Sequence, residues 1–208
     1  MRGLFRFLWP LGLGALLLAG CCANNVCDCQ DEQADALYFR FDTSGGPGSF
    51  APLTELDTVL LKRFALPLDA SGQPLAGRGT TAHIDTLNAK GSFDLVTIVR
   101  ATAVGADAIV LNNNFPFAQS GARKLSTYLY RIEVRGAPLG PKQFLKTMPR
   151  KYELNQIALK GEFYGNGCCT CYRNTLKSAT LTDLSTGKVQ LPAMANAQPG
   201  PVYTLITK

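Results

Sequence analysis

Short segments in which apolar and polar residues alternate follow one another along most of the chain. The clearest is segment 126–135, where apolar side chains occupy every second position from Tyr128 to Val134 and Arg131 and Glu133 lie between them. This two-residue period predicts a half-buried β-strand. Similar segments predict strands at residues 37–41, 58–64, 93–99, 108–111, 152–161, 175–183, 188–191 and 202–207.

The segments between these strands are rich in glycine, proline and asparagine, which end strands and turn the chain. No segment shows the long 3.6-residue period of an amphipathic helix, and only residues 101–108 and 141–148 are short helix candidates. A series of strands without alternating helices predicts an all-β fold, namely an antiparallel β-sandwich of the immunoglobulin-like or transthyretin-like kind.

Composition places the chain among globular proteins of ordinary domain size. It has 208 residues, of which 46% are hydrophobic and 17% are charged, and this balance excludes a disordered tail. The formal net charge is +6, but lysine and arginine are scattered and never form a run longer than two. Because nucleic-acid binding needs clustered basic residues, we expect no nucleic-acid partner.

The first twenty residues have the layout of a secretory signal peptide. Arg2 and Arg6 precede an apolar run from Phe7 to Ala19, and small residues follow it. The run is too short to cross a bilayer core, which needs about 20 apolar residues. We therefore expect residues 1–20 to be cleaved from the mature protein.

The motif Leu18-Ala19-Gly20-Cys21 resembles the lipobox of bacterial lipoproteins. The resemblance implies that the Cys21 thiol receives a diacylglyceryl group, that a peptidase cuts just before Cys21, and that the new amino group is acylated. Several acyl chains, at about 0.8 kcal/mol per buried methylene, hold a protein stably on a membrane. The alternative is an ordinary signal peptide with a chance cysteine at the cleavage point.

The residues after Cys21 bear on which membrane surface would carry the protein. Position 22 is cysteine; an aspartate there would resemble the inner-membrane retention signal of many Gram-negative bacteria, so its absence favours the outer membrane. Residues 28–35 are acidic, which resembles the surface-display signals of some Bacteroidota-type lipoproteins but also fits a plain solvated tether. The expected organisation is a cleaved segment 1–20, a lipidated acidic tether 21–36 and a β-sandwich domain 37–208.

Removing Cys21 from the seven cysteines leaves six, an even number suited to disulfides in an oxidising compartment. They form two groups of three, and adjacent cysteines bridge each other only through a strained ring, so pairing between the groups is expected. Fifteen pairings exist, and the sequence does not choose among them. The disulfide candidates are Cys22, Cys27, Cys29, Cys168, Cys169 and Cys171.

A bridge between the two groups would also fix where the domain lies. If Cys27 or Cys29 is bound to the body, only about six to eight residues separate the body from the lipid, a reach of at most about 28 Å. The sequence therefore predicts a domain held close to the membrane.

Two other roles for the cysteines remain open. Six thiolates could hold zinc or copper(I), which favour sulfur ligands, although neither group has the Cys-x-x-Cys spacing of familiar zinc sites. A thiol-redox site lacks the same motif. Disulfides are therefore favoured, and no metal or cofactor is expected.

Residues that could support catalysis are sparse. His83 is the single histidine, and no serine, cysteine and acid arrangement around it can be identified, so we expect no enzyme. A hydrolase with an unrecognised site is the alternative. Asn112, Asn113 and Asn114 with Phe115 and Phe117 could contact a glycan or peptide, but a turn with a hydrophobic plug is the favoured interpretation.

Taken together, the lipobox, Cys27-Asp28-Cys29, segments 37–42 and 58–64, and the Gly167–Tyr172 segment resemble small lipoproteins of Bacteroidota-type bacteria. This resemblance implies a location and no mechanism. We expect a lipid-anchored cell-envelope protein that acts as a binding or structural module, with the membrane as one partner and an envelope protein or glycan as another.

Overall fold

The computed structural model describes Cys27, Cys29 and residues 34–75, 79–100, 108–118, 123–137, 149–166, 168–191 and 201–208. Each strand in this part of the chain overlaps a segment in which the alternating pattern predicted one. The strands are β1 (Leu37–Phe41), β2 (Thr58–Ala65), β3 (Asp94–Val99), β4 (Ile109–Leu111), β5 (Tyr128–Arg135), β6 (Arg150–Asn166), β7 (Cys169–Asp183), β8 (Val189–Gln190) and β9 (Tyr203–Ile206).

The strands form two sheets, and the predicted all-β, sandwich-like fold is confirmed. One sheet has the antiparallel order β3-β2-β5-β6-β7-β8, and the other has the order β4-β1-β9. The smaller sheet departs from a purely antiparallel arrangement because β9 pairs with β1 in parallel, from Tyr38↔Tyr203 to Phe41↔Ile206. A closer likeness to immunoglobulin or transthyretin folds stays a prediction.

The main hydrophobic core lies between the two sheets. Alternating residues of the larger sheet, such as Leu61, Ile132 and Leu154, are fully buried against Phe39 of β1 and Ile206 of β9. This packing explains the apolar positions of every second residue, because only one face of each strand points into the core.

The other face of the larger sheet is covered as well, by helix α3 (Thr81–Ala89). Ile84 of this helix packs with Phe64 and Leu129 in a second apolar cluster. All residues of β5 from Tyr128 to Val134 are therefore buried, and the prediction of a half-buried strand there is wrong. The remaining helices are short: α2 (Pro52–Glu55) and the 3₁₀ turn η3 (Leu125–Thr127).

Charged side chains between the sheet and α3 are paired. Arg131 Nη1 lies 2.7 Å from Asp85 Oδ1 of the helix, and Arg131 Nη2 lies 3.0 Å from Glu153 Oε2. Glu133 pairs with Arg135 at 2.7 Å and with Lys62 at 3.6 Å. Since an unpaired buried charge is strongly unfavourable, these pairs allow a polar layer beneath the helix.

No helix in the described part of the chain is long and apolar enough to cross a membrane. The helix candidates at residues 101–108 and 141–148 lie outside the described ranges except at Ala108, which is not helical.

Candidate functional site

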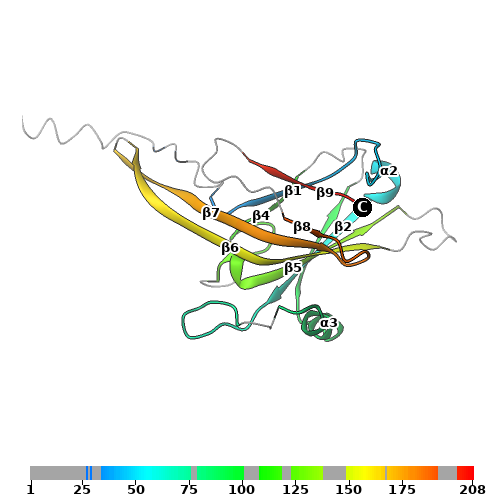
Figure 1. Cartoon of the computed structure of the whole chain (residues 1–208), viewed down its shortest axis with the longest axis horizontal. Coiled ribbons are helices and arrows are strands. Elements are labelled where there is room, and N and C mark those ends of the chain that lie inside the picture. Colours follow the sequence, from blue (N-terminus) through cyan, green and yellow to red (C-terminus); the bar gives the residue numbers. More distant parts are fainter. Residues whose placement is uncertain are drawn as a thin grey trace, which may run out of the picture.

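Strands β6 and β7 continue well beyond the body of the sheet. Strand β5 pairs with β6 only as far as Leu154, and β8 pairs with β7 only at Leu181 and Thr182. From the pair Ala158↔Ser178 to the pair Asn166↔Cys169 the two strands bond to each other alone among the described strands. We call this two-stranded part, residues 158–166 and 168–178, the arm; it curves away from β5 and α3 (Figure 1).

The arm is exposed and carries aromatic side chains. Residues 160–165 are all exposed, and Phe163 is 74% exposed although its ring lies 5.2 Å from that of Tyr172. The Tyr172 ring also covers Gly161, where a Cβ atom would collide with that ring and with the Arg173 carbonyl. Glycine is therefore required at position 161 by close approach, as in other strands where an aromatic ring covers a glycine.

Two disulfides attach the arm to the N-terminal segment. Cys27 bonds to Cys169 and Cys29 to Cys171, with Cα–Cα distances of 5.6 and 5.3 Å that are usual for a disulfide. Pairing between the two cysteine groups is thus confirmed for these residues. Cys168 is disulfide-bonded as well, whereas the predicted sites Cys21 and Cys22 lie outside the described residues.

Further contacts hold the N-terminal segment along β7 towards the body. The Asp35 N–H donates to Asn174 Oδ1 at 2.8 Å, and Asn174 Nδ2 donates to Asp35 Oδ1 at 2.6 Å. Lys177 Nζ donates to the Ala36 carbonyl at 3.0 Å. Burial lowers the pKa of Lys177, while the Asp35 carboxylate acts in the opposite direction. The four described residues Cys27, Cys29, Asp35 and Ala36 contact β7 at Cys169, Cys171, Asn174 and Lys177 in that order, so they follow β7 in parallel from the tip of the arm towards the body.

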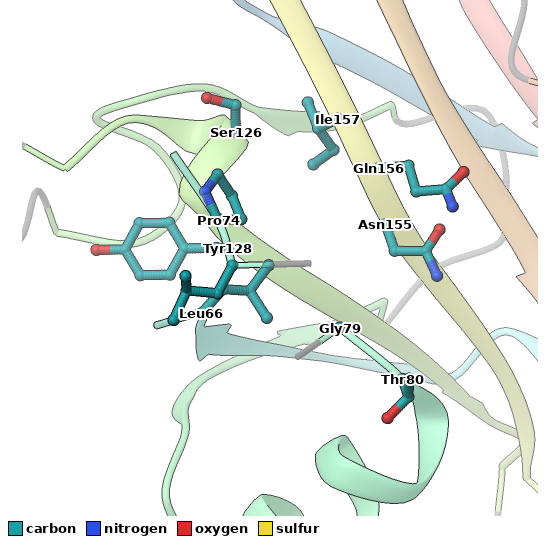
Figure 2. Close-up of a pocket in the computed structure, with 10 residues that line it drawn as sticks. Leu66, Pro74, Gly79, Thr80, Ser126, Tyr128, Asn155, Gln156 and Ile157 are labelled. Atoms are coloured by element: carbon teal, nitrogen blue, oxygen red, sulfur yellow. The ribbon is translucent and has the colours of Figure 1, made fainter. Parts of the chain in front are cut away.

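A cavity of about 420 Å³ lies where β6 leaves β5. Figure 2 shows Leu66 and Pro74 on one side and Asn155 to Ile157 of β6 on the other. A β-bulge interrupts the register between Asn155 and Ala158, and Gln156 has a φ of 51°, which is strained for a residue with a side chain. Bulges and strained residues cluster at functional sites, so this cavity is the second candidate site.

The lining of the cavity is mainly apolar, with polar groups in the bulge. Asn155 Nδ2 donates to Glu153 Oε1 at 3.4 Å, while Asn155 Oδ1 is buried with no hydrogen-bond partner among the described residues. Gln156 Oε1 accepts a hydrogen bond from the Thr180 hydroxyl at 2.9 Å. A mainly apolar cavity of this volume suits a small uncharged molecule.

The remaining residues considered in the sequence do not belong to either site. His83 lies in α3, is partly exposed and is not among the described residues that line the cavity. Asn112 Oδ1 accepts the N–H groups of Asn114 and Phe115 at 2.8 and 2.6 Å, and Phe117 is buried against the Tyr130 ring. The prediction of a turn with a hydrophobic plug is confirmed.

Disulfide formation changes the cysteine chemistry available. Of the six disulfide candidates, Cys27, Cys29, Cys169 and Cys171 are bonded in the two bridges, so their sulfur atoms are not thiolates that could bind a metal ion. No group of three or more histidine, cysteine, aspartate or glutamate residues suited to a metal ion occurs within the described ranges.

The cavity was not predicted from the sequence, although the sequence contains a signal for the β6 bulge beside it. In the segment predicted as one strand, the apolar residues occupy even positions at Tyr152 and Leu154 and odd positions at Ile157 and Leu159. Because a strand alternates with a strict period of two, this change of phase indicates a bulge between them. By contrast, the roles of Asn174 and Lys177 depend on contacts distant in sequence and leave no local pattern.

Comparisons with protein-family models, with curated proteins and with solved structures found no match to this chain.

Proposed function

We propose that this protein is a lipid-anchored protein of the bacterial cell envelope that acts as a binding or structural module. The observation that carries the proposal is the attachment of the arm to Cys27 and Cys29, directly after the lipobox cysteine Cys21. Such bridges are typical of proteins exported to an oxidising compartment. The chain has seven cysteines, and since disulfides use them in pairs, at least one stays outside intramolecular bridges. Cys21 is the residue to which the lipobox assigns the lipid.

The anchor is tested by labelling cells with radioactive palmitate. Wild-type protein is expected to carry the label and to sediment with membranes, whereas the Cys21→Ser variant loses the label. Cys22→Ser is the matched control, because it removes the neighbouring cysteine and leaves the lipobox cysteine in place. Equal labelling of wild type and Cys21→Ser would refute the anchor. Separation of the two membranes by density then tests the expected preference for the outer membrane.

The cavity beside the β6 bulge favours a binding role over a purely structural one. The occupant that fits its volume and apolar lining is a small uncharged molecule, which Asn155 Oδ1 would bind through a hydrogen-bond donor. The uncharged dye N-phenyl-1-naphthylamine is a suitable probe, because its fluorescence rises in apolar surroundings.

An Ile157→Trp variant fills the cavity and is expected to abolish saturable dye binding. Leu191→Trp is the control, since Leu191 is 81% exposed and is not one of the lining residues. Absence of saturable binding by the wild type, or equal binding by both variants, would argue for a structural role.

The metal-binding alternative is separated from the disulfide framework by a thiol count. Purified, denatured protein is expected to show six more titratable thiols after reduction than before. Six titratable thiols without reductant would instead favour the thiolate metal site. A hydrolase that used His83 as its base would lose activity in the His83→Ala variant.

A further inference from the structure

The arm presents aromatic residues to solvent close to its turn. Phe163 is 74% exposed and Tyr164 is 36% exposed, and they lie three and two residues before Asn166, the last residue of β6. Large apolar side chains on an exposed, covalently held hairpin indicate an interaction surface more than a folding contact.

The bridge at Cys27 sets the distance between this surface and the predicted lipid. Cys27 bonds to Cys169, the first residue of β7, so the N-terminal segment is fixed beside the turn. Cys27 follows Cys21 by six residues, which reach at most about 21 Å when fully extended. The described residues of the segment run along β7 from the tip towards the body, and Cys27 is the one nearest the turn. A lipid on Cys21 therefore holds the membrane surface within about 21 Å of Cys27, which is fixed at the tip of the arm.

We propose that the tip of the arm lies in the headgroup region of the membrane that holds the anchor, with Phe163 and Tyr164 in contact with lipid. This inference rests on the proposed lipid attachment at Cys21. Aromatic side chains favour the boundary between headgroups and acyl chains, where Phe163 can be buried while the Tyr164 hydroxyl stays hydrated. Because the lipid on Cys21 already holds the protein on the membrane, the tip binds lipid at a high effective concentration. Even a weak affinity of the tip for lipid is then sufficient to keep it in contact with the membrane.

The charges of the arm indicate that anionic lipid is not required. Arg173 Nη2 lies 2.8 Å from Glu162 Oε1, so the charge of the arginine beside Phe163 and Tyr164 is balanced, and the other positive charges of the arm, Lys160 and Lys177, lie further from its turn. The Arg173 guanidinium also lies 5.0 Å from the centre of the Tyr164 ring, which places the pair next to the aromatic surface. The contact is therefore expected with zwitterionic phosphatidylcholine and at high salt.

The test uses tryptophan fluorescence in the lipidated protein. The chain contains one tryptophan, Trp9, which lies in the segment predicted to be cleaved. Phe163→Trp therefore gives the mature protein a single reporter at an exposed position that does not affect the core. The lipidated variant is reconstituted into phosphatidylcholine vesicles that contain brominated lipid, and at least a twofold quenching of its fluorescence is expected. Val99→Trp is the matched control, because Val99 is 66% exposed on β3, at the opposite edge of the larger sheet, and should stay unquenched.

Each outcome has a defined meaning. If mass spectrometry confirms the lipid and Phe163→Trp is quenched no more than Val99→Trp, the membrane contact of the arm is overturned while the anchor stands. If the protein with an intact lipobox is purified from cells without lipid and does not bind vesicles, the proposed function fails and this inference fails with it. Quenching of Phe163→Trp that disappears in the Cys21→Ser background supports the contact and shows that it depends on the anchor.

Discussion

The two ends of the β6–β7 hairpin are stabilised by different means. In the body, Leu154 and Leu181 are fully buried between the sheets, and Glu153 is buried against Arg131 beneath α3. In the arm, Glu162 and Phe163 of the same strand are exposed, and disulfides from Cys169 and Cys171 replace the missing packing. An isolated two-stranded hairpin is at best marginally stable in water, so the arm needs these covalent contacts. One pair of strands therefore contributes to the core at one end and presents an exposed surface at the other.

Reduction of the disulfides should have the largest effect on the free energy of unfolding. Opening both bridges, each between residues 142 apart, is expected to lower the free energy of unfolding by about 7 kcal/mol on the chain-entropy model, of which about 5 kcal/mol comes from closing the long loop. Removing one bridge, in the Cys29→Ser/Cys171→Ser variant, should cost only about 2 kcal/mol, because Cys27–Cys169 still closes the long loop. Urea titrations with and without dithiothreitol measure both values. A single-bridge variant as unstable as the reduced protein would contradict this account.

Truncation of apolar side chains should distinguish the two ends of β6. Leu154→Ala leaves a cavity in a fully packed core and is expected to cost about 3 kcal/mol. Phe163→Ala removes a larger side chain from an exposed position and should change stability by less than about 0.5 kcal/mol. Urea midpoints of the oxidised proteins give the comparison. Similar losses for both variants would mean that the arm is packed against something in solution.

The ion pairs of the two regions should contribute differently to the pH dependence of stability, and this is the smallest of the expected effects. Burial acts to raise the pKa of Glu133. The hydrogen bond and charge of Arg135 and the charge of Lys62 act in the opposite direction and outweigh burial, so the pKa lies below the ordinary 4.5. A carboxyl group with a lowered pKa contributes stability above its unfolded pKa and loses it as the pH falls through the folded value. The stability gap between wild type and Glu133→Gln should therefore close in acid. Glu162→Gln, in the exposed pair of the arm, should show little gap at any pH.

Much of the sandwich could be predicted from the sequence because burial between two sheets leaves a strict alternation. In β5 every second side chain, Tyr128, Tyr130, Ile132 and Val134, faces the main core, whereas Leu129 packs on the other face of the sheet with Ile84 of α3. The pattern did not predict α3, since within Thr81–Ala89 only Ile84 is fully buried and the helix leaves almost no apolar period. The predicted strand also ended at Gly161, because residues 162–165 are all exposed and do not alternate between apolar and polar.

The candidate site was predictable in its components and not in its arrangement. The count of seven cysteines and their two groups indicated cross-pairing, but the choice of Cys27 with Cys169 depends on how β7 lies beside the N-terminal segment. The same holds for Asp35, whose partner Asn174 is 139 residues away. Local patterns carry no information about such distant contacts, and only the assembled sheet brings them together.

The position of the bridges determines which bonds bear a mechanical load. A pull on the chain before Cys27 reaches the Cys27–Cys169 disulfide before it reaches β1. The force then enters β7 through a covalent bond, and the Cys29–Cys171 bond and the Asp35–Asn174 contacts follow in order along the same strand. Strand β1 is held to β4 and β9 by only a few hydrogen-bonded residue pairs, and a force applied directly to β1 would have to be borne by them. The bridges therefore direct tension at the N-terminus into the β6–β7 hairpin, the longest in the described fold, and away from β1 and the smaller sheet.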